Sequence, residues 1–224
     1  MIAYRPMTVL ANRLNILYVR CMNCANTTSV CPGVWKDIPN GIPPRGFFFK
    51  AVPVKILIVA KNPGHPMRGE SDLFKGRTGT DLFGAYRNYQ ENYYPDPNRV
   101  REPSTRFHKT LFRYVSLLLD IPKEDVYFHA AHTNLVKCST PDEQAKLNLT
   151  TMDACYTQYF RAELELLRPR VLLALGREVE RFLIKRSSDH HLPVIYIKHP
   201  SYPYRREDEA RILGELRNQI LAYL

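Results

Sequence analysis

Four of the five cysteines in this chain stand in two spaced pairs. Cys21 and Cys24 form a C-x-x-C, a loop that can aim two thiolates at one ion, and Cys138 and Cys155 form the second pair. An odd number of cysteines and an N-terminus without the continuous apolar run of a secretory signal favour a metal site or free thiols over disulfides. Four thiolates suit zinc or an iron–sulfur cluster, and their spacing leaves both open. Cys31 is left over.

Three polar residues follow short apolar runs and have side chains suited to catalysis or recognition. Asn62, in A-K-N-P-G-H, could orient a water molecule, although N-P-G is also an ordinary turn. His199, in H-P-S-Y, could donate a hydrogen bond to a developing anion or act as a general acid; a packing role is the alternative. Asn134, in T-N-L-V-K-C, offers a paired donor and acceptor that match the edge of an amide-like base, or it could simply cap a strand.

Aromatic residues supply the remaining candidates. Phe74 stands two residues before the glycine turn G-R-T-G (76–79), where a ring could stack on a flat ligand or pack in the core. The segment 84–104 mixes tyrosines with arginines, a combination that suits single-stranded or flipped nucleic acid and also a solvated loop.

The elements that must position these residues alternate between strand and helix. The apolar patterns predict strands over 54–60, within 126–136, over 171–175 and over 193–197, and helices over 7–20, 105–119, 151–167, 177–186 and 206–224. A capping box at Thr140–Glu143 predicts a further helix start, and 25–53 is expected to be a long loop. This alternation predicts a three-layer α/β/α fold around a central, mostly parallel four-stranded sheet, with right-handed crossovers. Ligands of such sheets bind at the carboxyl ends of the strands, where the three polar motifs fall.

Composition narrows the class of protein. The chain has 224 residues, 45% hydrophobic and 24% charged, so we expect one globular domain over 1–224 with an insertion over about 84–104. Lysine and arginine exceed aspartate and glutamate by 32 to 22, a net charge of +10 that favours a nucleic-acid partner, with an acidic membrane second. No apolar run reaches membrane-spanning length. We therefore expect an intracellular protein, cytoplasmic or nucleoid-associated, that acts as a monomer.

Taken together, the motifs resemble the uracil-DNA glycosylase superfamily. Ala60–Gly64 looks like the first motif of its mismatch-specific branch. The other motifs resemble the iron–sulfur branch, often called family four: Phe74 before G-R-T-G, T-N-L-V-K-C (133–138), Cys155 before a helix, P-R-V-L-L-A-L-G (169–176) and H-P-S-Y (199–202). Any one motif is weak, but five in this order, at strand ends, are specific.

The resemblance implies a set of roles. Cys21, Cys24, Cys138 and Cys155 would hold a [4Fe–4S] cluster, with zinc as the alternative metal, and residues 1–53 would form a cluster-binding extension. The implied catalytic residues are Asn62 and His199, and the substrate-binding residues are Ala60, Lys61, Gly64, Phe74 and Asn134. The loop after His199 would contact DNA through Ser201, Tyr202, Arg205 and Arg206.

The function implied is a monofunctional DNA glycosylase of base excision repair that removes uracil or a related deaminated or mismatched base. Lys61 departs from the family-four pattern, which has a glutamate at that position. It favours one alternative, a non-catalytic nucleic-acid-binding protein that keeps the fold and the cluster. A zinc-stapled RNA-binding module is the third hypothesis.

Overall fold

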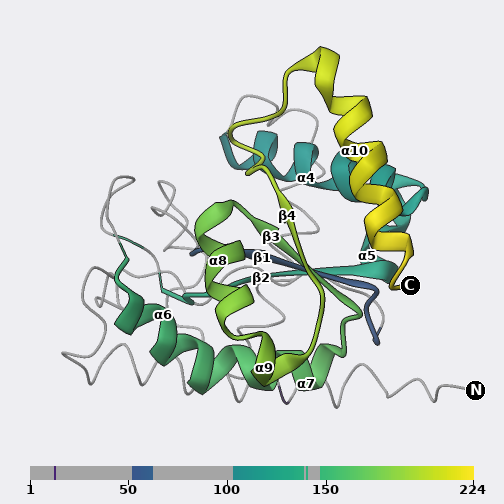
Figure 1. The fold of residues 1–224 in the computed structure, drawn as a ribbon. Coiled ribbons are helices and arrows are strands. Elements are labelled where there is room, and N and C mark those ends of the chain that lie inside the picture. Colours follow the sequence, from purple (N-terminus) through teal and green to yellow (C-terminus); the bar gives the residue numbers. More distant parts are fainter. Residues whose placement is uncertain (1–12, 14–51, 63–102, 139, 141–146) are drawn as a thin grey trace, which may run out of the picture. The chain divides into compact units, whose positions relative to one another are not determined.

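A computed structural model of the chain describes Arg13 and residues 52–62, 103–138, 140 and 147–224 (Figure 1). The helix expected over 7–20, the loop over 25–53 and the insertion over 84–104 lie almost entirely outside these residues, as does the helix start after Thr140. The described residues fall into two compact units. The first holds residues 60–62 and those between Thr133 and Leu166; the second holds 52–59, 103–132 and Leu167–Leu224. A single domain over 1–224 stays a prediction.

The strands form one four-stranded sheet in the order β2-β1-β3-β4. They are β1 (Ile56–Ala60), β2 (Ala130–Asn134), β3 (Val171–Leu175) and β4 (Val194–Ile197). Both β1 with β3 and β3 with β4 are parallel, and Val59, Ala174 and Tyr196 lie in register. The bonds from Lys55 N–H to His129 O and from Leu135 N–H to Ala60 O show that β2 runs in the same direction. The predicted α/β class is confirmed.

Burial differs between the strands. Every residue of β1 and β3 is buried, as expected of continuous apolar strands inside a parallel sheet. Every residue of β2 is buried too, although its sequence AAHTN includes three polar residues. In β4 half-buried and buried residues alternate. His199 therefore follows a strand that is less completely buried than the other three.

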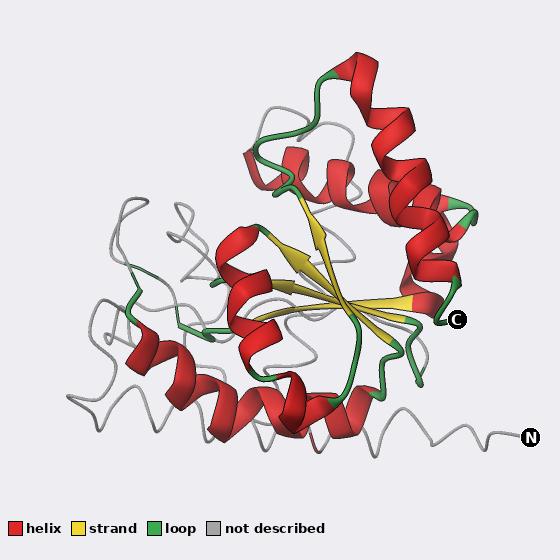
Figure 2. Cartoon of the chain, viewed as in Figure 1, coloured by secondary structure: helices red, strands yellow, loops and turns green. Residues whose placement is uncertain are grey.

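Helices cover both faces of the sheet (Figures 1 and 2). On one face α8 (Arg177–Lys185) packs against β3 and β4. On the other, α10 (Arg206–Leu221) packs against α4 (Pro103–Leu119) and β4. Right-handed crossovers require this division, because the step from β1 to β2 and the step from β3 to β4 run in opposite directions along the sheet. The three-layer α/β/α fold is confirmed.

The second strand lies within residues 126–136, as predicted, and covers the middle of that segment. The 3-10 turn η2 (Lys123–Asp125) continues into the single helical turn α5 (Val126–His129), and β2 begins at Ala130. Within α5 Val126 is buried whereas Phe128 is 46% exposed. A period of two would place these two side chains on the same face, so the apolar letters V-Y-F do not mark a strand here.

One helical stretch runs through the first unit. It comprises α6 (Leu149–Cys155), the π-helical segment η3 (Tyr156–Phe160) and α7 (Arg161–Leu167). Asn148 caps its start, because its side-chain oxygen accepts a hydrogen bond from Thr151 N–H at 2.8 Å. The stretch agrees with the helix predicted over 151–167, and within it Cys155 is the last residue of α6, directly before η3 and α7, and is buried.

Gly176 joins β3 to α8 with a φ of 95°, a conformation that side-chain-bearing residues rarely adopt. A Cβ at this position would have no atom within 4 Å, so backbone conformation rather than space calls for glycine. The helices α8 and α9 (Ser187–His190) then lead to β4.

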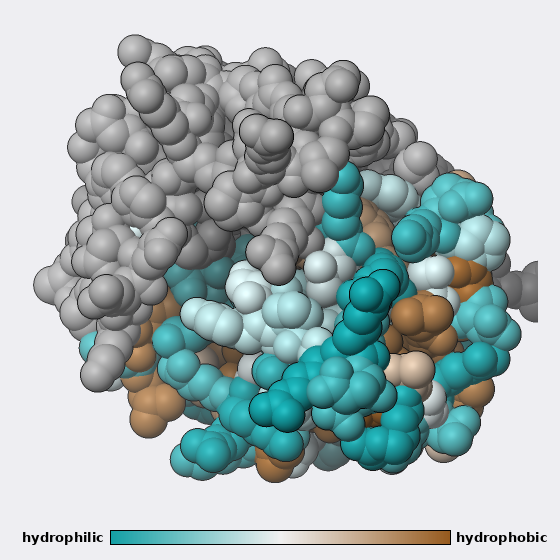
Figure 3. Space-filling model, turned by 90° about the horizontal axis from the view of Figure 1, so that it is seen from above, coloured by the Kyte–Doolittle hydropathy of each residue, from teal (hydrophilic) through white to brown (hydrophobic). Residues whose placement is uncertain are grey.

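The described surface in Figure 3 is largely hydrophilic, with apolar side chains in smaller separate patches. Among the helices of the described residues, none has the length and apolar character to cross a membrane.

Candidate active site

The ends of β1 and β2 are tied together in the first unit. Backbone N–H groups of Leu135 and Val136 donate to the carbonyls of Ala60 and Lys61, both at 2.8 Å. These two hydrogen bonds continue the β1–β2 pairing beyond Asn134. They hold the segment after Asn134 beside Ala60 and Lys61, which lead into Asn62. The structure thus brings two of the predicted site segments to one place.

Asn62 is tethered through its side chain. Its Nδ2 donates to Oγ1 of Thr140 at 3.5 Å, a long hydrogen bond, and Thr140 is buried. Because Nδ2 faces the threonine, Oδ1 is the side-chain atom left to accept a hydrogen bond from a water molecule. The sequence predicted Thr140 only as a helix cap. Its contact with Asn62, 78 residues away in the chain, is formed by the fold.

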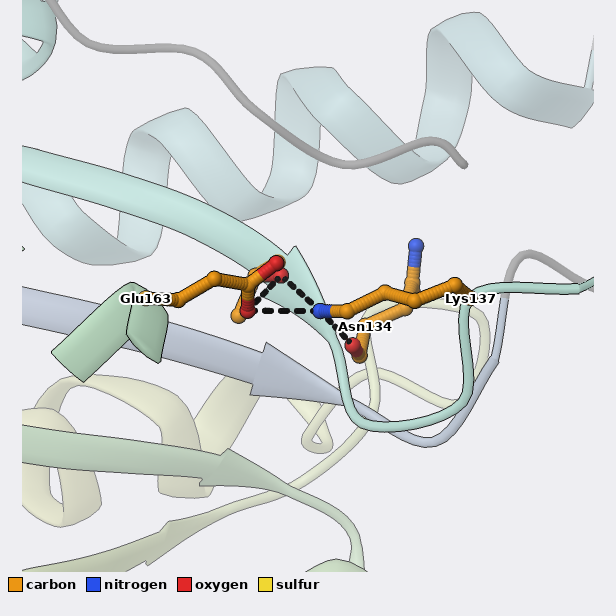
Figure 4. A network of polar contacts seen from close by, with 4 residues as sticks. Asn134, Lys137 and Glu163 are labelled. Atoms are coloured by element: carbon orange, nitrogen blue, oxygen red, sulfur yellow. Dashed lines mark hydrogen bonds and ion pairs between the residues drawn. The ribbon is translucent and has the colours of Figure 1, made fainter. Parts of the chain in front are cut away.

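Asn134 ends β2 and is only 2% exposed. Its backbone carbonyl accepts a hydrogen bond from Nζ of Lys137 at 2.5 Å, and Lys137 pairs with Glu163 (Figure 4). Burial raises the pKa of Glu163, while Lys137 and the Thr133 hydroxyl lower it. The sequence analysis missed this pair. Lys137 lies within T-N-L-V-K-C and could have been noticed, but nothing in the letters around Glu163 marks it as buried.

His199 lies in a loop of the second unit, two residues beyond β4. Its Nδ1 accepts a hydrogen bond from the backbone N–H of Ser201 at 3.2 Å, and burial lowers the pKa of its imidazole. Both features favour the neutral ring, and an accepting Nδ1 puts the proton on Nε2. The loop therefore presents Nε2–H as a neutral hydrogen-bond donor.

Aromatic rings surround this imidazole. The Phe107 ring of α4 lies 5.2 Å from that of His199, centroid to centroid, and 5.9 Å from that of His132. The Tyr202 ring lies 6.4 Å from His199 on the loop itself. Phe107 comes from α4 and no motif singled it out, so only the folded chain identifies it as a neighbour of His199.

Tyr204 anchors the loop at its far end. Its hydroxyl accepts a hydrogen bond from Lys198 N–H at 2.9 Å, and its own backbone N–H donates to the hydroxyl of Tyr114 at 3.4 Å. The rings of Tyr114 and Tyr204 lie 5.9 Å apart. The loop from Lys198 to Tyr204 is thus closed on itself and fixed to α4, with His199 inside the closure.

The residues predicted to contact DNA lie on the outside of this loop. Ser201, Arg205 and Arg206 are exposed, and Tyr202 is 72% exposed. Three acidic residues follow in the first turn of α10, where the helix dipole favours negative charge. Two of them are neutralised within the second unit: Glu209 pairs with Arg113, and Asp208 with Arg211.

Two of the four predicted metal ligands are described. Cys138 is half-buried just beyond β2 and Cys155 is buried at the end of α6, both in the first unit. Cys21, Cys24, Gly64 and Phe74 lie outside the described residues. Among the residues that the structure does describe, no three or more His, Cys, Asp or Glu side chains gather as a metal site would need.

The sequence of the chain matches a known protein family. The family model described as "Uracil DNA glycosylase superfamily" matches residues 48–223. The chain belongs to the uracil DNA glycosylase superfamily. This membership indicates a glycosylase, a hydrolase that acts on DNA in repair, on an α/β/α fold. A search of curated proteins found no match.

Proposed function

We propose that this member of the uracil DNA glycosylase superfamily is a monofunctional glycosylase that removes uracil, or a related deaminated or mismatched base, in base excision repair. The observation that carries the proposal is the state of His199. A neutral imidazole, fixed through Nδ1 to Ser201 N–H, offers Nε2–H to an anion. A leaving base develops such an anion when its glycosidic bond breaks.

The reaction follows from charge and geometry. The target base leaves the stack and enters the site. The bond between C1′ of the sugar and the base nitrogen breaks, its electron pair goes to the base, and water supplies the new oxygen on C1′ and a proton for the base. His199 stabilises the base anion through Nε2–H, a fixed donor aimed at developing charge. Asn62, tethered to Thr140, orients the water through Oδ1.

Recognition of the base is assigned to the residues around Asn62 and Asn134. The Asn134 carboxamide reads the polar edge of the base, and Phe74 stacks on its ring. Ala60, Lys61 and Gly64 belong to the first motif and would contact the base together with Asn134. The hydrogen bonds from Leu135 and Val136 to Ala60 and Lys61 support this, because they hold the first motif beside Asn134.

Duplex DNA is held by the basic surface and by the loop after His199. Ser201, Tyr202, Arg205 and Arg206 press into the minor groove and keep the duplex open. Their exposure supports this role, as does the net charge of +10. We infer that the protein acts as a monomer on chromosomal DNA inside the cell.

A [4Fe–4S] cluster held by Cys21, Cys24, Cys138 and Cys155 is the proposed cofactor, with zinc as the alternative. Thiols in the first unit at Cys138 and Cys155 supply donors of the type that either metal takes. When bound, the cluster would brace this part of the fold, because hydrolysis transfers no electrons.

Iron content tests the cofactor. Cys155→Ala is expected to abolish the brown chromophore and the bound iron, while Cys31→Ala leaves both nearly unchanged. A colourless wild-type protein with stoichiometric zinc would replace the cluster with zinc.

Single-turnover excision tests the activity. Oligonucleotides carrying uracil, a thymine mismatch or hypoxanthine are incubated with excess protein, and abasic sites are revealed with alkali. We expect excision from at least one substrate and much slower excision by Asn62→Ala and His199→Ala, with DNA binding retained. A wild-type protein that binds DNA but excises no base would establish the alternative that Lys61 favours, a non-catalytic nucleic-acid-binding protein.

A further inference from the structure

A buried ion pair lies directly behind the residue assigned to reading the base. Nζ of Lys137 and Oε2 of Glu163 are 2.6 Å apart, and each side chain is 1% exposed. Lys137 comes from the turn after β2 and Glu163 from α7, so the pair joins two segments of the first unit. Neither residue has a part in the chemistry described above.

The hydrogen bonds of the lysine are complete. Its ammonium group donates to three acceptors: Thr133 Oγ1 at 2.8 Å, Asn134 O at 2.5 Å and Glu163 Oε2 at 2.6 Å. The Thr133 hydroxyl in turn donates to Glu163 Oε2 at 3.0 Å. An ammonium group has three protons, so the set is fully satisfied, as a buried charge requires.

Stability does not account for such a pair. Apolar residues of similar volume often serve as well or better in a protein interior, because both charges must leave water. What apolar residues cannot do is bind the Asn134 carbonyl, which stands where the chain leaves the sheet. The lysine holds that carbonyl, and on the next two residues the N–H groups of Leu135 and Val136 are bonded to β1.

The backbone of Asn134 is therefore held by its own carbonyl and by the two peptide units that follow it. Figure 4 shows the side chain of Asn134 directed away from the ammonium group of Lys137, while its carbonyl points toward it. With the backbone fixed, the direction of the carboxamide is restricted to its side-chain rotamers. A shift of the carbonyl would tilt the carboxamide relative to any base opposite it.

We propose that Lys137 and Glu163 are positioning residues for Asn134 and that they set the base selectivity of the enzyme. The pair acts through the Asn134 carbonyl and touches no substrate. The inference rests on the proposed function, since it assumes that Asn134 reads the base.

The test is a mutational cycle on single-turnover excision. The double variant Lys137→Met with Glu163→Leu removes both charges and keeps the volume, so it is expected to fold. We expect its uracil rate to fall about tenfold or more, and the ratio of its uracil rate to its rates on other bases to fall with it. Asn134→Ala is expected to lose the same selectivity. Adding the double change to Asn134→Ala should cost no more than about twofold further, because effects that act through one residue do not add.

A matched control removes an ion pair elsewhere. Asp120→Asn with Arg217→Gln breaks an exposed pair whose atoms lie 2.7 Å apart in the second unit, and excision should be unchanged. Thermal unfolding and iron content are measured on every variant. Unchanged base selectivity in the folded double variant would overturn the inference. So would a full further loss in the Asn134→Ala background, or a loss of rate that tracks lost iron, since each indicates a purely structural pair. Failure of the proposed function is separate: the wild-type protein would then excise nothing.

Discussion

Asn134 and His199 are held in opposite ways. Asn134 sits in a dry, charged network in which its own backbone is bonded to a buried lysine. His199 sits in a half-buried loop, where the Ser201 N–H bonds its Nδ1 and the rings of Phe107 and Tyr202 lie beside it. A group that must discriminate between bases needs a fixed direction, and a buried polar network gives that. A group that must stay neutral and donate a hydrogen bond needs an environment that disfavours its charged form, and burial lowers the pKa of His199 in this way.

The largest expected difference between the surroundings of Asn134 and those of His199 is in their contribution to the free energy of unfolding. Lys137→Met alone leaves the buried Glu163 carboxylate without its counter-charge and the Asn134 carbonyl without its lysine donor. We expect this change to lower the free energy of unfolding by about 3–5 kcal/mol. Adding Glu163→Leu should recover most of that loss. Denaturant unfolding of both variants is the measurement. If the single variant were as stable as the wild type, the network would not be the closed, dry one described above.

The next effect is on rate. His199→Ala removes a fixed donor to developing charge and is expected to slow single-turnover excision about 10²- to 10³-fold on every base that the enzyme accepts. DNA affinity and unfolding should change little, because His199 is half-buried and, among the residues that the structure describes, its removal leaves no buried charge unpaired. Asn134→Ala gives the contrast, since its loss should fall unequally on the different bases. If both variants lost the same excision rate on every base, the assignment of Asn134 to base recognition and of His199 to stabilising the leaving base would be contradicted.

The pH dependence sharpens the same comparison. Because burial lowers the pKa of His199 below its ordinary 6.5, the excision rate should hold as pH falls to 6.5 and drop only at lower pH. Protonation places a hydrogen on Nδ1, which breaks the bond from Ser201 N–H and frees the ring. The sign for folding is the same: the folded state binds this proton less tightly than the unfolded chain, so the stability contribution is lost as pH falls through the folded pKa.

A change at Phe107 is expected to move the acid limb of the pH–rate profile, the range in which the excision rate drops as pH falls. Phe107→Ala removes the ring 5.2 Å from His199 and exposes the imidazole, so the acid limb should shift to higher pH, whereas Phe107→Leu should keep it in place. Rate against pH and the ring proton shifts of His199 measure the change. An acid limb at the same pH in Phe107→Ala would mean that Phe107 does not desolvate the imidazole.

The smallest effect concerns the anchor of the loop. Tyr204→Phe deletes the acceptor for Lys198 N–H while keeping the ring against Tyr114. We expect the free energy of unfolding to fall by about 1 kcal/mol. Excision should slow by less than about tenfold, because the bond from Ser201 to His199 persists. Tyr202→Phe, on the exposed side of the loop, is the matched control and should leave unfolding unchanged. A loss as large as that of His199→Ala would place the anchor, rather than Ser201, in control of the imidazole.

Sequence alone predicted the sheet well, and the reason is burial. Runs such as VLLAL at Val171–Leu175 are short and apolar at every position, which is typical of a strand covered on both faces, and β1, β3 and the long helices fall where these patterns indicate. The pattern over 126–136 located β2 but not its first residue, because the turn at Val126–His129 carries apolar letters without burying all of them. Asn62, Asn134 and His199 could be proposed from the letters because each stands at or just beyond the end of a strand in a parallel sheet.

The partners of those residues were decided by the tertiary structure. Thr140 meets Asn62 across 78 residues, Glu163 meets Lys137 across 26, and Phe107 reaches His199 from a helix that precedes β2. Local patterns report how a side chain relates to its own helix or strand, and they carry no distance to a residue on another element. A buried charge such as Glu163 looks like any surface glutamate until the fold encloses it, and only its lysine makes that burial tolerable.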